Sequence, residues 1–121
     1  MEFKFKKEFP DFEKRKEESS KLRLQCPDKV PVICEKDPKC NLEGNIDKTK
    51  YLIPGDLTVS QFGFMIRQRT FLEKEQSLFI LFQGNKNPPL DCFMDEIYER
   101  YKDPEDGFLY ATYSSELVWG N

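Results

Sequence analysis

The sequence contains no histidine, and this absence narrows the chemistry that the chain can perform. Without an imidazole, no Ser/His or Cys/His pair can activate a nucleophile, and no Gly-rich phosphate-binding loop is present. We therefore expect a protein that is not an enzyme and that has no catalytic residue, metal site or cofactor. A lone reactive cysteine is the enzymatic alternative, although buried cysteines more often have a structural role.

Cysteine itself is scarce and lacks the spacing of a metal or redox motif. The four cysteines are Cys26, Cys34, Cys40 and Cys92, and they form no C-x-x-C pair. A four-cysteine zinc site is the weaker alternative, because this spacing differs from that of the common sites. Since disulfides persist mainly in oxidising compartments, free thiols in a reducing compartment are the better interpretation.

Long apolar runs are also missing. No window of about 18 apolar residues, the length needed to cross a bilayer, occurs in the chain. The N-terminal residues 1–8 carry too many charges for a signal peptide. We therefore expect a cytoplasmic protein that acquires any membrane role by attachment after synthesis.

Length and charge describe a single domain with an uneven charge distribution. The 121 residues are 38% hydrophobic, which is enough for one modest core. The formal charge of −3 argues against general nucleic-acid binding. Residues 91–121 contain eight acidic and two basic side chains, so that residues 1–90 carry a net charge of +3. The larger part of the protein is therefore expected to attract an acidic partner.

The first half of the chain predicts a helix followed by a hairpin. Residues 11–25 favour a helix, with Asp11 as its N-cap. Residues 29–35 alternate as a strand does, with apolar side chains on both faces, and we expect the helix to cover part of the face of Pro31 and Ile33. A polar connection over residues 37–47 leads to a second strand over residues 48–53.

The second half predicts a crossing helix, two strands and a short helix. Thr58-x-x-Gln61 is a capping box that opens a helix to about residue 69, and the apolar run over residues 78–82 fits a strand buried on both faces. Helical spacing over residues 94–101 predicts a short helix, for which we expect Asp91 to be the cap. After a last strand over residues 108–114, residues 115–121 lack periodicity and are expected to form a mobile tail.

This order of elements describes an α+β fold, the ubiquitin-like β-grasp. Six segments then resemble, in order, the GABARAP branch of the autophagy-related ubiquitin-like modifiers: Phe9–Arg15, Pro27–Ile33, Lys50–Pro54, Asp56–Phe62, Ile66–Arg69 and Asp106–Tyr110. The resemblance implies a four-stranded mixed sheet with two additional N-terminal helices, the first within residues 1–9. It divides the chain into a helical extension (1–27), a ubiquitin-like domain (28–114) and a processed tail (115–121).

The resemblance also implies a life cycle in autophagy. A dedicated cysteine protease trims the tail, and ubiquitin-like activating and conjugating enzymes carry the protein as a thioester and join it to phosphatidylethanolamine. The lipidated form acts on autophagosome or other vesicle membranes, whereas the unconjugated form is cytoplasmic. On the membrane it recruits cargo receptors by binding short aromatic-x-x-aliphatic motifs.

Gly120 is the predicted attachment point, exposed by cleavage before Asn121. A carboxylate that is passed between thiols in narrow active sites benefits from a residue without a side chain, and glycine meets that demand. On the dipeptide alone, a frayed chain end would be the better interpretation; the family resemblance reverses this. Trp119 keeps the aromatic type, since relatives usually have Phe or Tyr before the glycine.

Two apolar pockets beside the second strand are the predicted peptide-binding site. If this strand lies at the sheet edge, its backbone can pair with an extended peptide whose alternate side chains enter the pockets. By family correspondence, the aromatic pocket comprises Glu18, Leu22, Pro31, Ile33, Lys48, Lys50, Leu52 and Phe108. The aliphatic pocket comprises Tyr51, Ile53, Pro54, Leu57, Phe62, Met65, Ile66 and Arg69.

Two alternatives accompany this hypothesis. Without the resemblance, the same apolar residues would be read as ordinary core and the basic ones, such as Lys29 and Arg67, as an ordinary solvated face. A functional alternative is a ubiquitin-like adaptor in vesicle trafficking that is never conjugated. Such an adaptor would keep the pockets but would not need Gly120.

Overall fold

The structure is a computed structural model that describes residues 2–40, 42 and 44–115. Its elements are α1 (Lys4–Glu8), α2 (Phe12–Gln25), β1 (Lys29–Lys36), β2 (Lys50–Pro54), α3 (Val59–Arg67), β3 (Phe79–Phe82), α4 (Met94–Tyr101) and β4 (Leu109–Ser114). The predicted order is confirmed, including the short first helix. Some boundaries differ slightly from the prediction, since α3 ends at Arg67 and β4 begins at Leu109.

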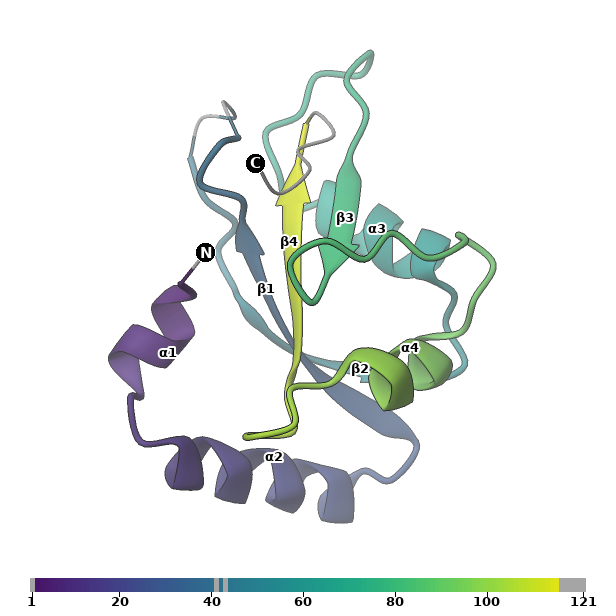
Figure 1. Ribbon diagram of the computed structural model, residues 1–121. Helices are drawn as coiled ribbons and strands as arrows, with labels where there is room; N and C mark the ends of the chain where they lie inside the picture. Colours follow the sequence, from purple (N-terminus) through teal and green to yellow (C-terminus); the bar gives the residue numbers. More distant parts are fainter. Residues whose placement is uncertain (1, 41, 43, 116–121) are drawn as a thin grey trace.

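The four strands form one mixed sheet in the order β2-β1-β4-β3. Strand β1 pairs with β2 antiparallel and with β4 parallel, and β3 pairs with β4 antiparallel. The first and last strands of the chain therefore lie at the centre, and β2 and β3 lie at the edges (Figure 1). This arrangement confirms the predicted β-grasp sheet.

The helices divide between the two faces of the sheet (Figure 1). Helices α3 and α4 cover the main core, to which β1 contributes Val30, Val32 and Cys34. Helices α1 and α2 cover a smaller cluster of Phe3, Phe5, Ile33, Phe108 and Tyr110, with Leu22 packed against it. The predicted alternation of β1, and the cover of its second face by α2, are both confirmed.

Local sequence signals set the starts of the longer helices. The side chain of Asp11 accepts a hydrogen bond from Glu13 N at 3.0 Å, which confirms that Asp11 is the N-cap of α2. At α3, Gln61 N donates to Thr58 Oγ1 at 3.2 Å and Thr58 N donates to Gln61 Oε1 at 2.8 Å, which completes the predicted capping box. Both helices therefore begin where the sequence places them.

The predicted cap of α4 is wrong. The N-cap residue is Phe93 rather than Asp91, and its own side chain accepts no capping hydrogen bond, although the Glu96 carboxylate accepts one from Phe93 N at 3.4 Å. Instead, Met94 N donates to Leu57 O at 2.7 Å, and Asp95 N donates to Gly55 O at 3.0 Å. Backbone groups of the β2–α3 connection therefore satisfy the first turn of α4 and remove the need for a capping side chain.

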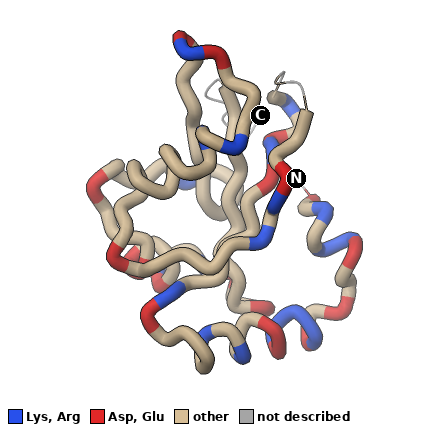
Figure 2. The backbone as a smooth tube through the Cα atoms, turned by 180° about the vertical axis from the view of Figure 1, so that it is seen from behind, with Lys and Arg blue, Asp and Glu red and all other residues tan. Residues whose placement is uncertain are grey.

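Charged residues are spread over the helices and connections, and residues of both signs lie along α2 (Figure 2). Only one narrow side of α2 is covered by the protein, and its buried residues are Arg15 and Ser19. This helix therefore lies on the sheet as a surface element, as the sequence predicts. Among the described residues, no helix is both long and apolar enough to cross a membrane.

Candidate peptide-binding site at the sheet edge

Strand β2 has a free edge in the described part of the chain, where its only partner strand is β1. Cys34 N donates to Thr49 O at 2.8 Å, which makes this position a hydrogen-bonded pair of the antiparallel ladder. Because such pairs alternate, Tyr51 and Ile53 direct their backbone groups toward β1, whereas Lys50 and Leu52 direct theirs outward. The outward N–H and C=O groups are available to an added strand.

Pro31 fits this ladder without the loss of a hydrogen bond. It lies opposite Leu52, at a position where the two strands do not bond to each other, and pairing of β1 with β4 begins only at Val32. The missing N–H of proline therefore costs neither neighbouring strand a partner. Pro31 can contribute its apolar ring to the α2 side of the sheet.

The predicted aromatic-pocket residues come together between β2 and α2. Ile33 and Phe108 have no exposed surface; they pack beneath this group with the half-buried Leu22, and these three residues are called its floor. Lys50 lies directly opposite Ile33 in the register, and Leu52 lies opposite Pro31, so that these pairs share the α2 side of the sheet. Pro31 is buried, Glu18 and Leu52 are half-buried, and Lys48 and Lys50 are exposed. The group thus has an apolar floor and a charged rim.

An ion pair joins the two walls of this group. The Lys50 ammonium contacts the Glu18 carboxylate, and their side chains are 45% and 36% exposed. The pair links β2 to α2 across the side of the sheet that holds Ile33. Because it is partly exposed, it can exchange partners at a cost of about 1 kcal/mol or less.

The predicted aliphatic-pocket residues lie between β2 and α3, but they differ in burial. Tyr51, Ile53, Phe62 and Ile66 are at most 4% exposed and belong to the main core. Pro54, Leu57 and Met65 are half-buried, and Arg69 is exposed. The apolar surface of this group is therefore supplied by the half-buried residues, and the four buried ones support it from below.

Basic side chains surround Tyr51. The Lys48 ammonium lies 5.3 Å and the Arg69 guanidinium 5.7 Å from its ring centroid, and the Tyr51 hydroxyl donates to Lys48 O at 2.6 Å. Arg69 also pairs with Asp47 at 3.0 Å. Burial raises the pKa of Tyr51 to about 12, so the phenol keeps its proton and remains a donor. This end of β2 therefore offers positive charge beside an apolar surface.

Arg67 is directed away from β2. Its Nη2 atom donates to Glu73 O at 3.0 Å and to Lys74 O at 3.3 Å, which ties the end of α3 to the following connection. The basic residues near the edge are thus Lys48, Lys50 and Arg69, without Arg67.

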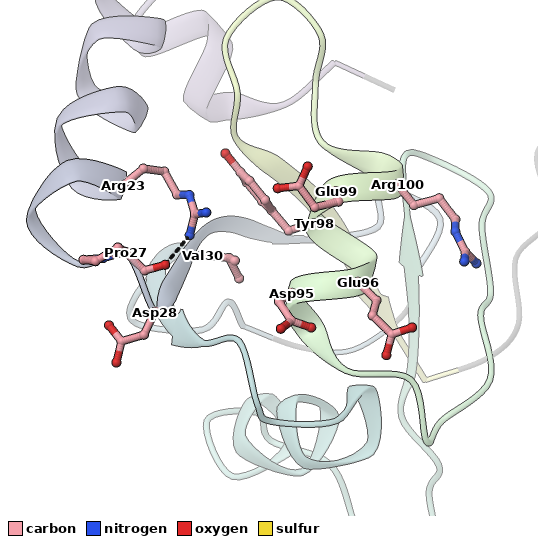
Figure 3. Close-up of a pocket in the computed structure, with 9 residues that line it drawn as sticks. All are labelled: Arg23, Pro27, Asp28, Val30, Asp95, Glu96, Tyr98, Glu99 and Arg100. Carbon is pink, nitrogen blue, oxygen red and sulfur yellow. Dashed lines mark hydrogen bonds between the residues drawn. The ribbon is translucent and has the colours of Figure 1, made fainter.

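A separate open groove of about 740 Å³ lies between the end of α2 and α4 (Figure 3). Arg23 crosses it, donating to Pro27 O at 3.0 Å and lying 5.1 Å from the centroid of Tyr98. This groove was not predicted from the sequence, where the acidic excess of residues 91–121 is the feature that corresponds to it. Its acidic residues are Asp28, Asp95, Glu96 and Glu99.

The comparisons with known proteins identify the family that has this fold. The family described as "Autophagy protein Atg8 ubiquitin like" matches residues 14–120. The chain belongs to the Atg8 family. It is 50% identical to Autophagy-related protein 8 of Coccidioides immitis over all of both chains, and 50% identical to that of Emericella nidulans over 100% of this chain and 99% of the relative.

A solved structure shows the same fold at lower identity. The crystal structure of Trypanosoma brucei ATG8 is 41% identical, with a TM-score of 0.86 over 99% of this chain and 100% of that chain. As a member of the Atg8 family, the chain is a ubiquitin-like modifier of autophagy and not an enzyme. Atg8 membership also implies interaction with the conjugation machinery and association with autophagosomes.

The predicted attachment residue Gly120 lies outside the described residues, as does most of the predicted tail. The match to the Atg8 family nevertheless extends to residue 120. All four cysteines of the chain are free thiols. Within the described residues, no three His, Cys, Asp or Glu side chains are grouped as metal ligands.

Proposed function

We propose that this Atg8-family protein is joined through Gly120 to phosphatidylethanolamine and recruits cargo receptors by binding aromatic-x-x-aliphatic motifs along β2. In this proposal, residues 1–27 form a helical extension, residues 28–114 the ubiquitin-like domain and residues 115–121 the processed tail. The protein is cytoplasmic before conjugation and bound to autophagosome or other vesicle membranes afterwards.

The free edge of β2 carries the peptide-binding part of the proposal. The outward backbone groups of Lys50 and Leu52 can pair with an extended ligand, as in other complexes formed by strand addition. Side chains of a strand alternate between its faces, so an added strand presents one anchor toward α2 and another toward α3. Each fully buried anchor contributes roughly 1.5–3 kcal/mol before the cost of ordering the peptide.

Charge selects among such peptides. Lys48 and Lys50 are exposed at the edge, and Lys29 is half-buried at the start of β1. This basic rim would accelerate the association of motifs with acidic flanks, and it would disfavour the binding of basic peptides. We therefore propose that the preferred cargo-receptor motifs carry acidic flanks.

The attachment part of the proposal rests on the family match and on the chemistry of glycine. The match ends at residue 120, and a glycine carboxylate has no side chain to obstruct transfer between thiols. The partners are a cysteine protease that cuts before Asn121, followed by ubiquitin-like activating and conjugating enzymes. Phosphatidylethanolamine is the final acceptor.

Mass spectrometry after protease treatment tests the attachment. The full chain is incubated with the cysteine protease of the family and then with the conjugation enzymes and vesicles that contain phosphatidylethanolamine. We expect the loss of Asn121 alone, followed by a mass gain of one phospholipid. Gly120→Ala is the matched variant and should gain no lipid. An uncut chain, or a Gly120→Ala variant that still reaches autophagosomes, would fit a non-conjugated adaptor instead.

A further inference from the structure

Asp106 is a fully buried carboxylate in the connection between α4 and β4. Its Oδ1 atom accepts a hydrogen bond from Phe108 N at 2.9 Å. Its Oδ2 atom accepts from Arg15 Nε at 2.8 Å and from the Tyr110 hydroxyl at 2.6 Å. One side chain is therefore hydrogen-bonded both to Phe108, in the floor of the aromatic pocket, and to Arg15 of α2.

A second contact fixes α2 against the same connection. The Ser19 hydroxyl donates to Asp106 O at 2.5 Å. Arg15 Nη1 also donates to the carbonyl of Phe9, the C-cap residue of α1, at 2.6 Å. Arg15, Ser19 and Leu22 lie at helical spacing on one face of α2. The face that contacts Asp106 thus also presents Leu22 to the floor formed by Ile33 and Phe108.

Gly107 permits this close approach of helix and connection. Its φ is +77°, and a Cβ atom at this residue would lie 2.8 Å from Ser19 Oγ. The hydroxyl of Tyr98, in α4, donates to Gly107 O at 2.6 Å. The connection is therefore hydrogen-bonded to both α2 and α4. Its position determines where β4 begins and where the Phe108 side chain lies.

We propose that Asp106 is a positioning residue for the aromatic pocket, fixing the distance between the α2 wall and the Phe108 floor. This inference rests on the proposed peptide-binding function. Asp106 is buried and does not contact the peptide; it acts through Phe108 on one side and through Arg15 and Ser19 on the other. The width of the pocket, and hence its preference for a large aromatic side chain, depends on these bonds.

A stabilising role alone would not require this arrangement. A buried ion pair contributes little net stability relative to well-packed apolar side chains, because both charges lose their hydration. Apolar substitutes would fill the same volume but would give Phe108 N no acceptor and Arg15 no partner. The carboxylate supplies directional bonds to two separate elements at once, and such bonds define a geometry.

Peptide discrimination separates positioning from stability. Three fluorescein-labelled ten-residue peptides are used as probes, identical except for Trp, Phe or Ala at the aromatic position of a motif with acidic flanks. Their dissociation constants are measured with the wild-type chain, Asp106→Asn, Ser19→Ala and Ser20→Ala. Ser20→Ala is the matched control, because Ser20 is the exposed neighbour on the same helix.

We expect Asp106→Asn to reduce the Trp-to-Ala affinity ratio by about fivefold or more, the order of effect of one charge-assisted hydrogen bond. Ser19→Ala should reduce the ratio about two- to threefold, and Ser20→Ala should leave it unchanged. The cross-peak of the Phe108 amide in a ¹H–¹⁵N spectrum should move in the first two variants only. If Asp106→Asn does not fold, Ser19→Ala decides the outcome.

Two results would overturn the inference in distinguishable ways. An unchanged ratio in Ser19→Ala and Asp106→Asn would show that Asp106 contributes stability alone, while peptide binding by the wild-type chain would stand. A wild-type chain that does not discriminate Trp from Ala would remove the aromatic pocket itself, and with it the proposed peptide-binding function.

Discussion

The Lys50 ammonium is paired with the Glu18 carboxylate, and this pair joins the edge strand β2 to helix α2 beside the floor of the aromatic pocket. Lys50 therefore has a partner before any peptide arrives. In the proposed peptide complex, an acidic peptide would compete with Glu18 for Lys50, and Glu18 should therefore lower the affinity for acidic motifs.

Removal of this competing charge should strengthen binding of acidic peptides. Glu18→Gln leaves Lys50 unpaired, and we expect about two- to fivefold tighter binding of a motif with acidic flanks. The free energy of unfolding should change by less than about 1 kcal/mol, because the pair is partly exposed. Fluorescence anisotropy at low and high salt measures the effect, which salt should reduce. A peptide with neutral flanks is the control, and an equal gain for both peptides would contradict this explanation.

The ionisation of Asp103 should link the docking of α1 to pH. Burial alone would raise the pKa of Asp103, but hydrogen bonds from Lys6 Nζ and from the backbone of Glu105 and Asp106 outweigh it and lower the pKa. Lys6 Nζ lies 2.8 Å from Asp103 Oδ2 and belongs to α1. Since the folded pKa lies below the ordinary value of 3.8, the stabilisation is present above that value and is lost as pH falls through the folded pKa.

Chemical denaturation at two pH values tests this linkage. Asp103→Asn should be less stable than the wild-type chain at pH 7, and the difference should shrink at a pH below 3.8, as the pH falls toward the lowered pKa of the native carboxylate. Glu105→Gln is the control, since the Glu105 side chain is exposed in the same connection. A difference that is constant between the two pH values would contradict the assignment to Asp103.

The local parts of this structure were predictable because the signals for them are local. Alternation over residues 29–35 gives the two faces of β1, and four residues define the Thr58 capping box. The pairing of Arg15 with Asp106 was not predictable from these patterns, since 91 positions separate the two residues and only the sheet topology brings them together. The prediction of the α4 cap failed for the same reason. Backbone groups of a connection that is distant in the sequence replace the expected side chain.

The depth of burial of each β2 side chain was not predictable from the sequence. Alternation along β2 places Tyr51 and Ile53 on the face opposite Lys50 and Leu52. It could not distinguish a pocket wall from core, because both demand apolar side chains on that face. The structure places Tyr51 and Ile53 in the main core and leaves the accessible apolar surface to their half-buried neighbours.

Glu35 should hold α1 against the sheet. Its buried carboxylate accepts hydrogen bonds from Lys4 N at 2.8 Å and from Phe5 N at 2.9 Å, which satisfies the first turn of α1. Glu35→Gln can accept only one of these bonds with its single carbonyl oxygen. We expect a loss of about 1–3 kcal/mol in the free energy of docking α1. Hydrogen exchange at the Lys4 and Phe5 amides should accelerate, while exchange in α3 stays constant; unchanged protection at both amides would refute this role.

Gly63 offers a stabilising substitution in α3. It lies inside the helix with an ordinary negative φ, and a Cβ atom there would meet only Ile80 Cδ1, at 4.0 Å. Nothing in this part of the structure therefore requires glycine, whose extra backbone freedom in the unfolded chain weakens the helix. Gly63→Ala should raise the free energy of unfolding by about 0.5–1 kcal/mol, measured by urea denaturation.

Gly107→Ala is the contrasting variant: its positive φ and the 2.8 Å approach to Ser19 Oγ should make the same substitution destabilising. Two changes of the same sign would show that conformational freedom and steric contact do not decide these positions.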